Sequence, residues 1–422
     1  MNVLVVGGGL SGIAAALRLR EAGADARIVE PGSLGGKART EALTPDWRVE
    51  HGPHSFTGRA DAVRVLAHSL GIGDRVESAD GNARARYLLR AGRLRRAGPG
   101  LLMSWPILKG IFRRVEDPPD VSVYEWFASR LGVPFADGPL GAMTAGIWAT
   151  SPDRIDMETG FAGIHRVVRQ HGTIVGALVR RDRGPMGTFT IRGGLGALGD
   201  AARVMLGQSG VAAVAAEGLS ADGTGWTMTT AQGPLHADAL VLAGDARSSA
   251  QLLRTLAPDA AQTLDAVEYS PLAVAHWTAA DARYPRGFGF LAEPASRVHS
   301  LGTLFVGDVL RDRAPVGFRS FATMFADSAI TEDHARTAIE AEHRLLTGHA
   351  VALERLHIIR HARAVSVPRP GHAKRMAALR AALPAGVTLA GAYLGAGAMD
   401  DAVRSGLAAA ATLLNQRRRH AA

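Results

Sequence analysis

The sequence predicts an α/β fold that contains a Rossmann-like dinucleotide-binding domain. A β-branched run at residues 2–6 ends in the glycine-rich turn GGGLSG, and the helical pattern after this turn stops at Gly23. A second strand-like run at residues 26–30 completes a βαβ unit. A strand, a glycine-rich turn and a helix recur from residue 387 toward the C-terminal end. This recurrence indicates one α/β domain that is assembled from separated segments.

We expect this domain to consist of residues 1–79, 186–252 and 371–422, with two insertions of different character. Residues 80–185 are predicted to be mostly helical, from patterns such as VYEWFASRLG. Residues 253–370 carry strand-like runs such as LAVAHWTA and FRSFATMFAD, which predict a mixed-sheet substrate domain. A chain of 422 residues is long enough for two or three such units.

Composition excludes several classes of protein. No cysteine is present, so disulfides, thiolate metal sites and cysteine nucleophiles are excluded. The formal charge is +9, but the cations are dispersed and no basic helix interleaved with aromatic residues occurs, so no nucleic-acid partner is expected. The start MNVLVVGGG has no signal-peptide pattern, and no apolar run approaches the ~20 residues of a spanning helix. We therefore expect a cytoplasmic location.

The turn after the first strand has the pattern expected for binding a dinucleotide. In Gly7-x-Gly9-x-x-Gly12 the first glycine permits the tight turn, the second lets a pyrophosphate approach the backbone, and the third lets helix and strand pack closely. Leu10 and Ser11 lie within this turn, where the N-terminus of the helix would hold the anion. We count all five residues as cofactor contacts.

The residues after this unit distinguish between dinucleotides. Glu30 ends the second strand, where a carboxylate accepts hydrogen bonds from a ribose diol. The chain then continues with LGGKART at residues 34–40 instead of another helix and strand. This stretch resembles the flavin-binding pattern of the amine oxidase superfamily, in which a second glycine pair, here Gly35 and Gly36, and an arginine, here Arg39, lie along FAD. The resemblance implies that FAD is the cofactor and that the α/β domain is of the amine oxidase type.

Four further stretches resemble the protoporphyrinogen oxidases. HGPHSF at residues 51–56 and TIRGGLGALGDAA at 190–202 are similar to two of their loops. Residues 287–325, from GFGFL through LGTLF to FATMF, resemble a block of their substrate domain. The C-terminal segments at 365–380 and 389–410 together match their last loop and helix.

The resemblance implies oxidation of a porphyrinogen to a porphyrin, in which FAD takes hydride and O2 reoxidises it with release of hydrogen peroxide. Such chemistry needs a flat apolar slot, a flavin edge and cations for the propionates, so no catalytic side chain and no metal ligand are assigned. Phe288 and Leu291 would clamp the ring, and Met324 would lie in the adjoining strand. Gly146 would leave room over the macrocycle, and Arg86 would pair with a propionate through its planar fork.

The resemblance also places residues of the opening loop and of the last loop beside FAD. The two histidines of HGPHSF could instead suggest a metal site, but Pro53 between them blocks a regular helix and no third ligand stands nearby. The cofactor contacts that the resemblance implies in these loops are Gly52, Pro53, His54, Ser55, Gly391, Met399, Asp401, Ala402 and Val403.

Several positions depart from the family pattern. The usual Asn-Asp-Cys of the last loop is Asp400-Asp401-Ala402 here, and Ala145 stands where some relatives have Arg. Coproporphyrinogen III therefore stays open as the substrate beside protoporphyrinogen IX. An amine oxidase or a carotenoid-type desaturase also stays open, although Tyr393 is the only aromatic residue near the last loop, where an amine oxidase would have a cage. A flavin- or tetrapyrrole-binding carrier without turnover is the non-enzymatic alternative.

One apolar segment suggests a further partner. GLLMSWPILKGIFRR at residues 100–114 is apolar and aromatic with flanking cations, as in an interfacial segment or the lining of a substrate channel. Because members of the family are often peripheral membrane proteins, the resemblance implies contact with an anionic membrane surface on its cytoplasmic face. The sequence also leaves a homodimer open.

Overall fold

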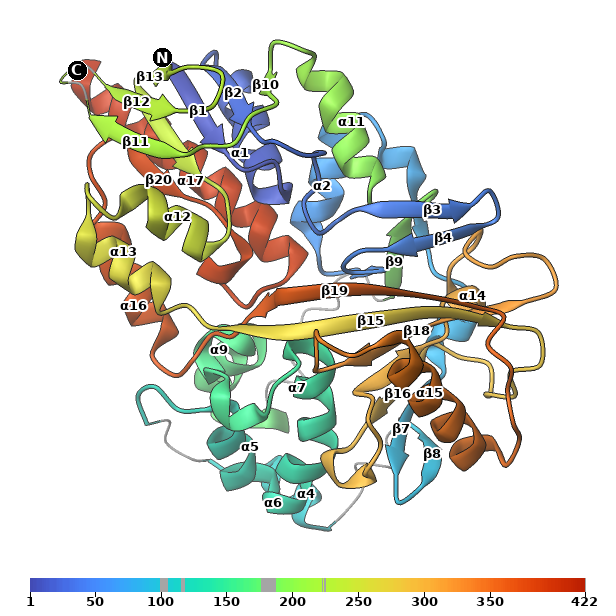
Figure 1. The fold of residues 1–422 in the computed structure, drawn as a ribbon. Coiled ribbons are helices and arrows are strands. Elements are labelled where there is room, and N and C mark those ends of the chain that lie inside the picture. The colour runs from blue at the N-terminus through green and yellow to red at the C-terminus, as the bar shows by residue number, and fades with distance from the viewer. Residues whose placement is uncertain (99–104, 115–117, 176–186, 222, 224, 422) are drawn as a thin grey trace.

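The computed structural model describes residues 1–98, 105–114, 118–175, 187–221, 223 and 225–421 (Figure 1). One unit is built on a five-stranded parallel sheet with the strand order β10-β2-β1-β14-β20. Its strands are β1 (Asn2–Val6), β2 (Asp25–Val29), β10 (Val211–Ala212), β14 (Ala239–Leu242) and β20 (Val387–Leu389). Because both faces of this sheet are covered, Val3, Leu4 and Val5 of β1 are all buried. The predicted Rossmann-like sheet is confirmed.

Helices from distant parts of the chain cover the two faces of this sheet. The first helix and the C-terminal helix pack side by side on one face, and a Cβ on Gly406 would overlap the carbonyl oxygen of Ser11 there. The helices on this face are α1 (Leu10–Glu21), α2 (Asp61–Ser69), α11 (Ala197–Leu206) and α17 (Met399–Ala421). The other face carries α12 (Ala246–Leu253), α13 (Pro258–Asp265), α16 (His372–Ala381) and a small sheet of β11 (Gly218–Ala221), β12 (Trp226–Thr229) and β13 (Leu235–Ala237).

A seven-stranded mixed sheet forms the core of the second unit, with the order β19-β15-β18-β17-β16-β7-β8. Every neighbouring pair is antiparallel except β16 and β7. Its strands are β7 (Arg86–Arg90), β8 (Arg93–Arg96), β15 (Tyr269–Ala279), β16 (Gly289–Ala292), β17 (Gly302–Leu304), β18 (Arg319–Phe325) and β19 (Arg355–Ser366). α15 (Glu332–Thr347) covers one face, and the short α14 (Val306–Val309) follows β17. The predicted mixed sheet is therefore confirmed.

The segment expected to be helical differs from that expectation at its start. Residues 86–96 form β7 and β8 and belong to the mixed sheet, because β7 pairs in parallel with β16 from Arg86 to Leu89. The helices after them are short: α4 (Trp105–Gly110), α5 (Val123–Leu131), α6 (Val133–Phe135), α7 (Gly141–Trp148), α8 (Met157–Gly160) and α9 (Ala162–His171). They share an aromatic core that includes Trp126, Phe127 and Trp148, and they lie below the long strands in Figure 1.

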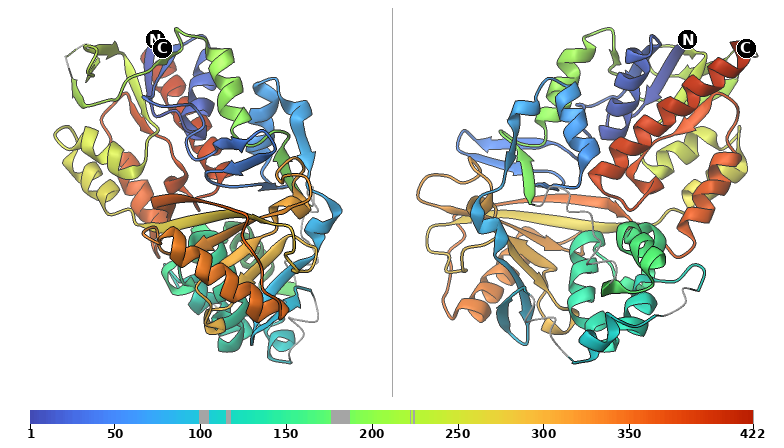
Figure 2. Two further views of the ribbon diagram at one scale, coloured as in Figure 1. Left: turned by 45° about the vertical axis from the view of Figure 1, so that its right-hand side comes forward. Right: turned by 180° about the vertical axis from the view of Figure 1, so that it is seen from behind.

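A β-hairpin and a three-stranded sheet join the units (Figure 2). The hairpin consists of β3 (Thr40–Thr44) and β4 (Trp47–Glu50), and the sheet of β5 (Phe56–Thr57), β6 (Val76–Ser78) and β9 (Thr188–Ile191). His276 Nε2 on β15 donates to the carbonyl oxygen of Glu50 at 3.1 Å, and His361 Nε2 on β19 donates to that of His51 at 2.6 Å. These hydrogen bonds hold the unit with the parallel sheet against the mixed sheet.

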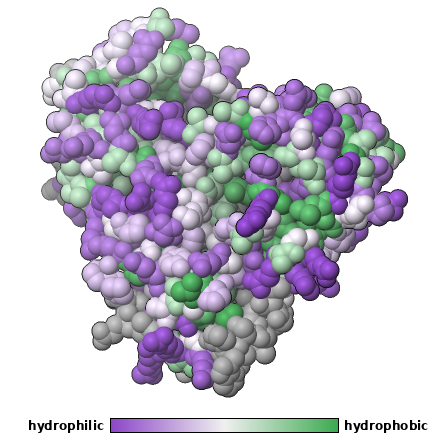
Figure 3. Space-filling model, turned by 60° about the horizontal axis from the view of Figure 1, so that its bottom comes forward, coloured by the Kyte–Doolittle hydropathy of each residue, from purple (hydrophilic) through white to green (hydrophobic). Residues whose placement is uncertain are grey.

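No helix within the described ranges is both long and apolar enough to cross a membrane. Of the apolar segment 100–114, residues 100–104 lie outside the described residues, and α4 begins at Trp105. Phe112, just after α4, leaves 62% of its surface exposed. Figure 3 brings the lower side of Figure 1, where α4 lies, toward the viewer and shows apolar patches separated by polar side chains. Contact with a membrane stays a prediction.

Candidate active site

The glycine turn after β1 has the shape of a phosphate-binding loop. Gly7 has a φ of +110°, and a Cβ there would lie 2.8 Å from the carbonyl group of Ala243. A Cβ on Gly9 would meet no atom within 4 Å, so the space above this residue is open. A Cβ on Gly12 would overlap the carbonyl oxygen of Gly7, so the strand and the helix can approach this closely only at a glycine. The open space at Gly9 fits a pyrophosphate at the N-terminus of α1.

The carboxylate of Glu30 lies beside the same turn. Its Oε2 accepts the Gly8 N–H at 2.8 Å and its Oε1 accepts the Gly32 N–H at 2.9 Å. The side chain is therefore fixed beside the open space at Gly9 and retains lone pairs for a ribose hydroxyl. Leu10 and Ser11 are buried in the first turn of α1, which leaves their backbone N–H groups for a ligand.

The second glycine pair packs directly on the first turn. Gly35 N–H donates to the Gly8 carbonyl oxygen at 2.8 Å, and Gly36 has a φ of +60°. A Cβ on Gly199 would overlap the carbonyl oxygen of Leu34, so the segment 190–202 lies against this loop. Arg39 is exposed, and its carbonyl oxygen accepts the N–H of His51. Stretches far apart in the sequence thus meet at one place.

The two histidines of the opening loop have different surroundings. His51 Nε2 lies 2.7 Å from Glu41 Oε2, whereas His54 is buried with its ring 5.3 Å from that of His276. Burial, together with the nearby Arg313 cation, lowers the pKa of His54 to about 4, so its imidazole is neutral.

The rest of the opening loop differs in exposure. Gly52 is tightly packed, because a Cβ there would lie 2.5 Å from the Lys37 carbonyl oxygen. Pro53 is exposed and Ser55 is half-buried. The loop therefore runs from a close backbone contact at Gly52 to the buried ring of His54.

The last loop leads into the N-terminus of α17. Gly391 N–H donates to Ser405 Oγ at 2.8 Å. Met399 and Ala402 are half-buried in the first turn of α17. Asp401 Oδ2 accepts the Ala398 N–H at 3.0 Å, and burial raises the pKa of this carboxyl.

Val403 is placed differently from the other residues of the last loop that the sequence assigned to the cofactor. Its side chain is 1% exposed and packs in the core between α1 and α17. Only the backbone of Val403 is therefore left to contact a cofactor.

The residues expected to bind substrate gather on the face of the mixed sheet opposite α15. Leu291 on β16 pairs with Gly302 on β17, which pairs with Met324 on β18, so these three residues form one row across the sheet. Phe288 and Met324 are partly exposed and pack against the same apolar cluster. Gly146 on α7 is exposed, and a Cβ there would overlap the side chain of Leu291. The helical unit therefore contacts Leu291 of this row through Gly146, a residue without a side chain.

Arg86 lies at the edge of the same face. Its guanidinium carbon is 4.2 Å from the centre of the Phe288 ring, and its Nη2 donates to Thr188 Oγ1 at 3.0 Å. Partial burial lowers the pKa of Arg86, although a guanidinium stays charged at any physiological pH. The structure thus brings together Arg86 and the apolar side chains that the sequence predicted as substrate contacts.

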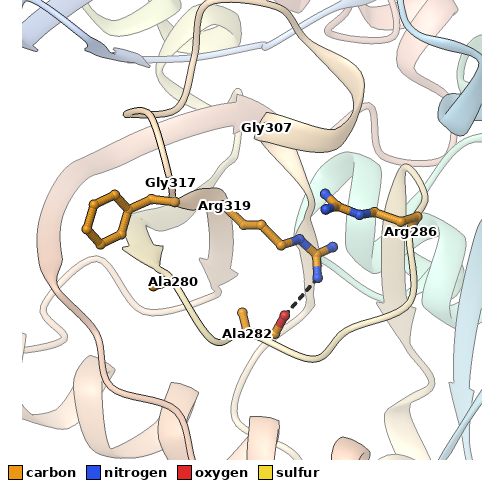
Figure 4. A pocket seen from close by; sticks show the side chains of 7 residues that line it. Ala280, Ala282, Arg286, Gly307, Gly317 and Arg319 are labelled. Carbon is orange, nitrogen blue, oxygen red and sulfur yellow. Dashed lines mark hydrogen bonds between the residues drawn. The ribbon is translucent and has the colours of Figure 1, made fainter.

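A pocket of about 520 Å³ lies elsewhere, at the outer end of the mixed sheet (Figure 4). In it the guanidinium groups of Arg286 and Arg319 face each other, and both bind the buried carboxylate of Asp308. None of the residues expected to bind FAD or substrate lines this pocket.

The sequence did not indicate Glu50 or Arg313 as parts of the site. Both side chains are buried, and they form an ion pair of 3.2 Å between β4 and the loop after α14. The sequence offered one signal, a glutamate next to HGPHSF at the end of a short strand. If such a residue is buried it needs a partner, because charged residues are rarely buried alone. The partner could not be identified from local sequence.

Comparison with known proteins shows which family the chain belongs to. The model of the family described as flavin containing amine oxidoreductase matches residues 10–414. A coproporphyrinogen III oxidase of Propionibacterium freudenreichii subsp. freudenreichii is 30% identical over 321 residues, which cover 62% of this chain and 60% of that protein. A protoporphyrinogen oxidase of Oryza sativa subsp. japonica is 27% identical over 369 residues, with 75% and 68% covered. A coproporphyrinogen III oxidase of Mycobacterium bovis is 27% identical, with 92% of each chain covered.

Solved structures show the same fold at lower identity. A candidate protoporphyrinogen oxidase from Exiguobacterium sp. 255-15 superposes with a TM-score of 0.83 at 18% identity, and 98% of each chain is covered. Cyclohexylamine oxidase from Brevibacterium oxydans IH-35A gives a TM-score of 0.73 at 17% identity, with 99% of each chain covered. The match to the family model spans nearly the whole chain. The chain therefore belongs to the flavin-containing amine oxidoreductase family, whose cofactor is FAD.

Proposed function

We propose that this flavin-dependent oxidoreductase oxidises protoporphyrinogen IX to protoporphyrin IX with O2 as the electron acceptor. The observation that carries the proposal is the row Leu291, Gly302 and Met324 on the face of the mixed sheet, with Arg86 and Phe288 at its edge. A flat, largely apolar macrocycle with carboxylate substituents matches such a surface. The names of the relatives in the comparison support the same substrate class.

The residues of the face have separate roles in this proposal. Leu291, Met324 and Phe288 contact the flat faces of the macrocycle and exclude water from it. Gly146 leaves room over the macrocycle indirectly: any side chain there would displace Leu291, which lies on the face that contacts the ring. Arg86 binds a propionate through its planar guanidinium, while its contacts with Phe288 and Thr188 hold it in place.

The cofactor loops would hold FAD, which is the oxidant of the substrate. The turn at Gly7–Gly12 would hold the pyrophosphate of FAD, Glu30 the ribose, and the loops at 51–56 and 391–403 the isoalloxazine end. When bound, FAD supplies a two-electron acceptor for hydride. The aromatic product provides the driving force, so the main task of the protein is to orient the macrocycle against the flavin edge, while the proton that accompanies each hydride passes to solvent.

Coproporphyrinogen III is the second candidate substrate. Relatives from Propionibacterium freudenreichii and from Mycobacterium carry this name, and the chain covers 92% of the one from Mycobacterium bovis. The two porphyrinogens differ in the number of propionates, so the cations at the edge of the face decide between them. Arg90, which follows Arg86 on β7, is already paired with Glu293 at 2.7 Å, which favours the substrate with fewer carboxylates.

The test is a side-by-side turnover assay. Purified protein with FAD is given each porphyrinogen in air, and porphyrin fluorescence and hydrogen peroxide are followed together. We expect a higher kcat/KM for protoporphyrinogen IX, with about three hydrogen peroxide molecules released per porphyrin, because a six-electron oxidation takes three two-electron flavin cycles. A preference for coproporphyrinogen III would reverse the substrate assignment. Porphyrinogen oxidation would be refuted if the protein turned over neither porphyrinogen. Oxidation of an amine or a polyene would then indicate another oxidase activity, and bound FAD without any oxidation would indicate a carrier.

A further inference from the structure

Glu50 joins the two loops that lie on the glycine turn. Its carboxylate is 1% exposed at the end of β4. Oε2 accepts the hydroxyl of Thr40 at 2.8 Å, and Oε1 accepts the N–H of Leu195 at 3.2 Å. Thr40 Oγ1 in turn accepts the N–H of Gly196 at 2.9 Å. One carboxylate therefore fixes LGGKART, the stretch that resembles a flavin-binding pattern, against the RGGL segment.

Arg313 reaches this carboxylate from the other unit. It lies in the loop between α14 and β18, its side chain is 2% exposed, and Nη2 is 3.2 Å from Glu50 Oε1. Burial raises the pKa of Glu50, whereas the positive charge of Arg313 opposes that shift. Removal of the cation would therefore raise the pKa of Glu50 further. A protonated carboxyl is a weaker acceptor for the Thr40 hydroxyl and the Leu195 N–H.

We propose that Arg313 is a positioning residue for the FAD site. By pairing with Glu50, it holds Thr40 and Leu195 together and so fixes the position of LGGKART beside the glycine turn. The mixed-sheet unit thereby sets the shape of a binding site that belongs to the nucleotide-binding unit. The proposal rests on FAD binding and not on which porphyrinogen is oxidised.

Other buried groups lie around the Glu50–Arg313 ion pair. The Glu50 carbonyl oxygen accepts from His276, whose ring lies beside that of His54. Arg313 Nε and Nη1 and His54 Nε2 are buried and have no hydrogen-bond partner among the described atoms. Buried donors of this kind would be satisfied by an ordered water or by a ligand.

The test measures the dissociation constant of FAD for the apoprotein. Arg313→Met keeps the length of the side chain and removes its charge. We expect FAD to bind about ten- to hundredfold more weakly, because hydrogen bonds to a charged group are lost. The matched control is Arg319→Met. Arg319 also forms an ion pair inside the protein, with Asp308 at 2.6 Å, and its hydrogen bonds go to Asp308, Ala282 and Tyr284 and not to LGGKART or the RGGL segment. The control should lower the midpoint of urea unfolding and leave the FAD constant within about twofold.

Thr40→Val keeps the proposal testable if Arg313→Met does not fold, and a double variant tests whether the two charged residues act together. Thr40→Val removes the hydroxyl that Glu50 holds and should also weaken FAD about tenfold. The double variant Glu50→Gln/Arg313→Met removes both charges. Because the two residues act as one unit, it should bind FAD no more weakly than whichever of Glu50→Gln and Arg313→Met binds FAD less tightly. An unchanged FAD constant in Arg313→Met and Thr40→Val, or an equal loss in Arg319→Met, would overturn the proposal. Wild-type protein that binds no FAD would instead refute the cofactor site itself.

Discussion

Arg86 lies with its guanidinium carbon 4.2 Å from the centre of the Phe288 ring, across two strands that are far apart in the sequence. Arg86 opens β7, and Phe288 directly precedes β16, which pairs with β7 in parallel. A cation on an aromatic face is held in orientation without using all of its hydrogen-bond donors. This arrangement leaves part of the guanidinium available to an incoming carboxylate at the edge of the apolar face.

The first prediction concerns this contact. Arg86→Ala should reduce kcat/KM for the porphyrinogen about ten- to hundredfold, because a charge-assisted interaction worth ~1.5–3 kcal/mol is lost. The loss should fall mainly on KM, and FAD content should stay the same. Arg93→Ala, an exposed arginine on the neighbouring strand β8, is the control. Equal and small effects at both positions would show that Arg86 does not bind a propionate.

A second prediction uses the contact between Gly146 and Leu291. Gly146→Val should displace the Leu291 side chain and narrow the face, which lowers kcat/KM about tenfold, because overpacking of this kind costs ~1–3 kcal/mol. Gly163→Val is the control, since a Cβ there would meet nothing within 4 Å. The second change Leu291→Ala should restore part of the activity of Gly146→Val. Steady-state kinetics check this, and no recovery in the double variant would argue against a shared space.

The third prediction addresses the ribose site. Glu30→Arg should release FAD on dialysis, because the ribose acceptor is lost and two hydrogen bonds to the loop, each ~1.5–3 kcal/mol for a charged acceptor, disappear with it. Glu21→Arg makes the same change of charge at an exposed position at the end of α1 and should keep its flavin. The ratio of flavin absorbance to protein absorbance measures the outcome. Retention of FAD by both variants would contradict the assigned role of Glu30.

The fourth prediction is a pH dependence of stability that comes from Glu342. This carboxyl is buried under the mixed sheet, where Ser300 Oγ donates to Oε2 at 2.5 Å, and burial raises its pKa to about 7. Because the folded state holds the proton more tightly than the unfolded state, the stabilisation is complete below the unfolded pKa of about 4.5. It is lost as the pH rises through about 7.

Glu342→Gln tests this dependence because its amide does not titrate. Between pH 5.5 and 8.5 the free energy of unfolding of the wild type should fall relative to that of Glu342→Gln by about 2 kcal/mol. Urea unfolding at both pH values provides the measurement. Glu340→Gln, on the same helix with a half-buried side chain, should show no such relative change. A constant difference between the wild type and Glu342→Gln would mean that Glu342 keeps an ordinary pKa in the folded protein.

The nucleotide-binding unit could be predicted from local sequence because its constraints are local. The turn at Gly7–Gly12 needs glycine for reasons that lie within a few residues, namely the φ of Gly7 and the contact of Gly12 with the Gly7 carbonyl oxygen. The carboxylate of Glu30 stands at the end of the adjacent strand, within the same βαβ unit. Such short-range geometry leaves a pattern that can be read along the chain.

The strands β7 and β8 could not be predicted in the same way. Residues 86–96 are rich in arginine and were expected to belong to a helical segment, but β7 is stabilised by hydrogen bonds to β16, from the distant segment 289–292. A strand of this kind takes its conformation from its neighbour more than from its own residues. The position of Arg86 beside Phe288 follows from that pairing.

The sequence by itself determined the fold class, the family and the cofactor, because these depend on short motifs whose physical reasons are local. Only the tertiary structure decided that Glu50 meets Arg313 inside the protein, and that Gly146 lies against Leu291. Residues from separate units come together through sheet pairing and burial, and the energy of a buried charge depends on the partner that the fold supplies. No periodicity along the chain encodes such a partner, since it is chosen by packing in three dimensions.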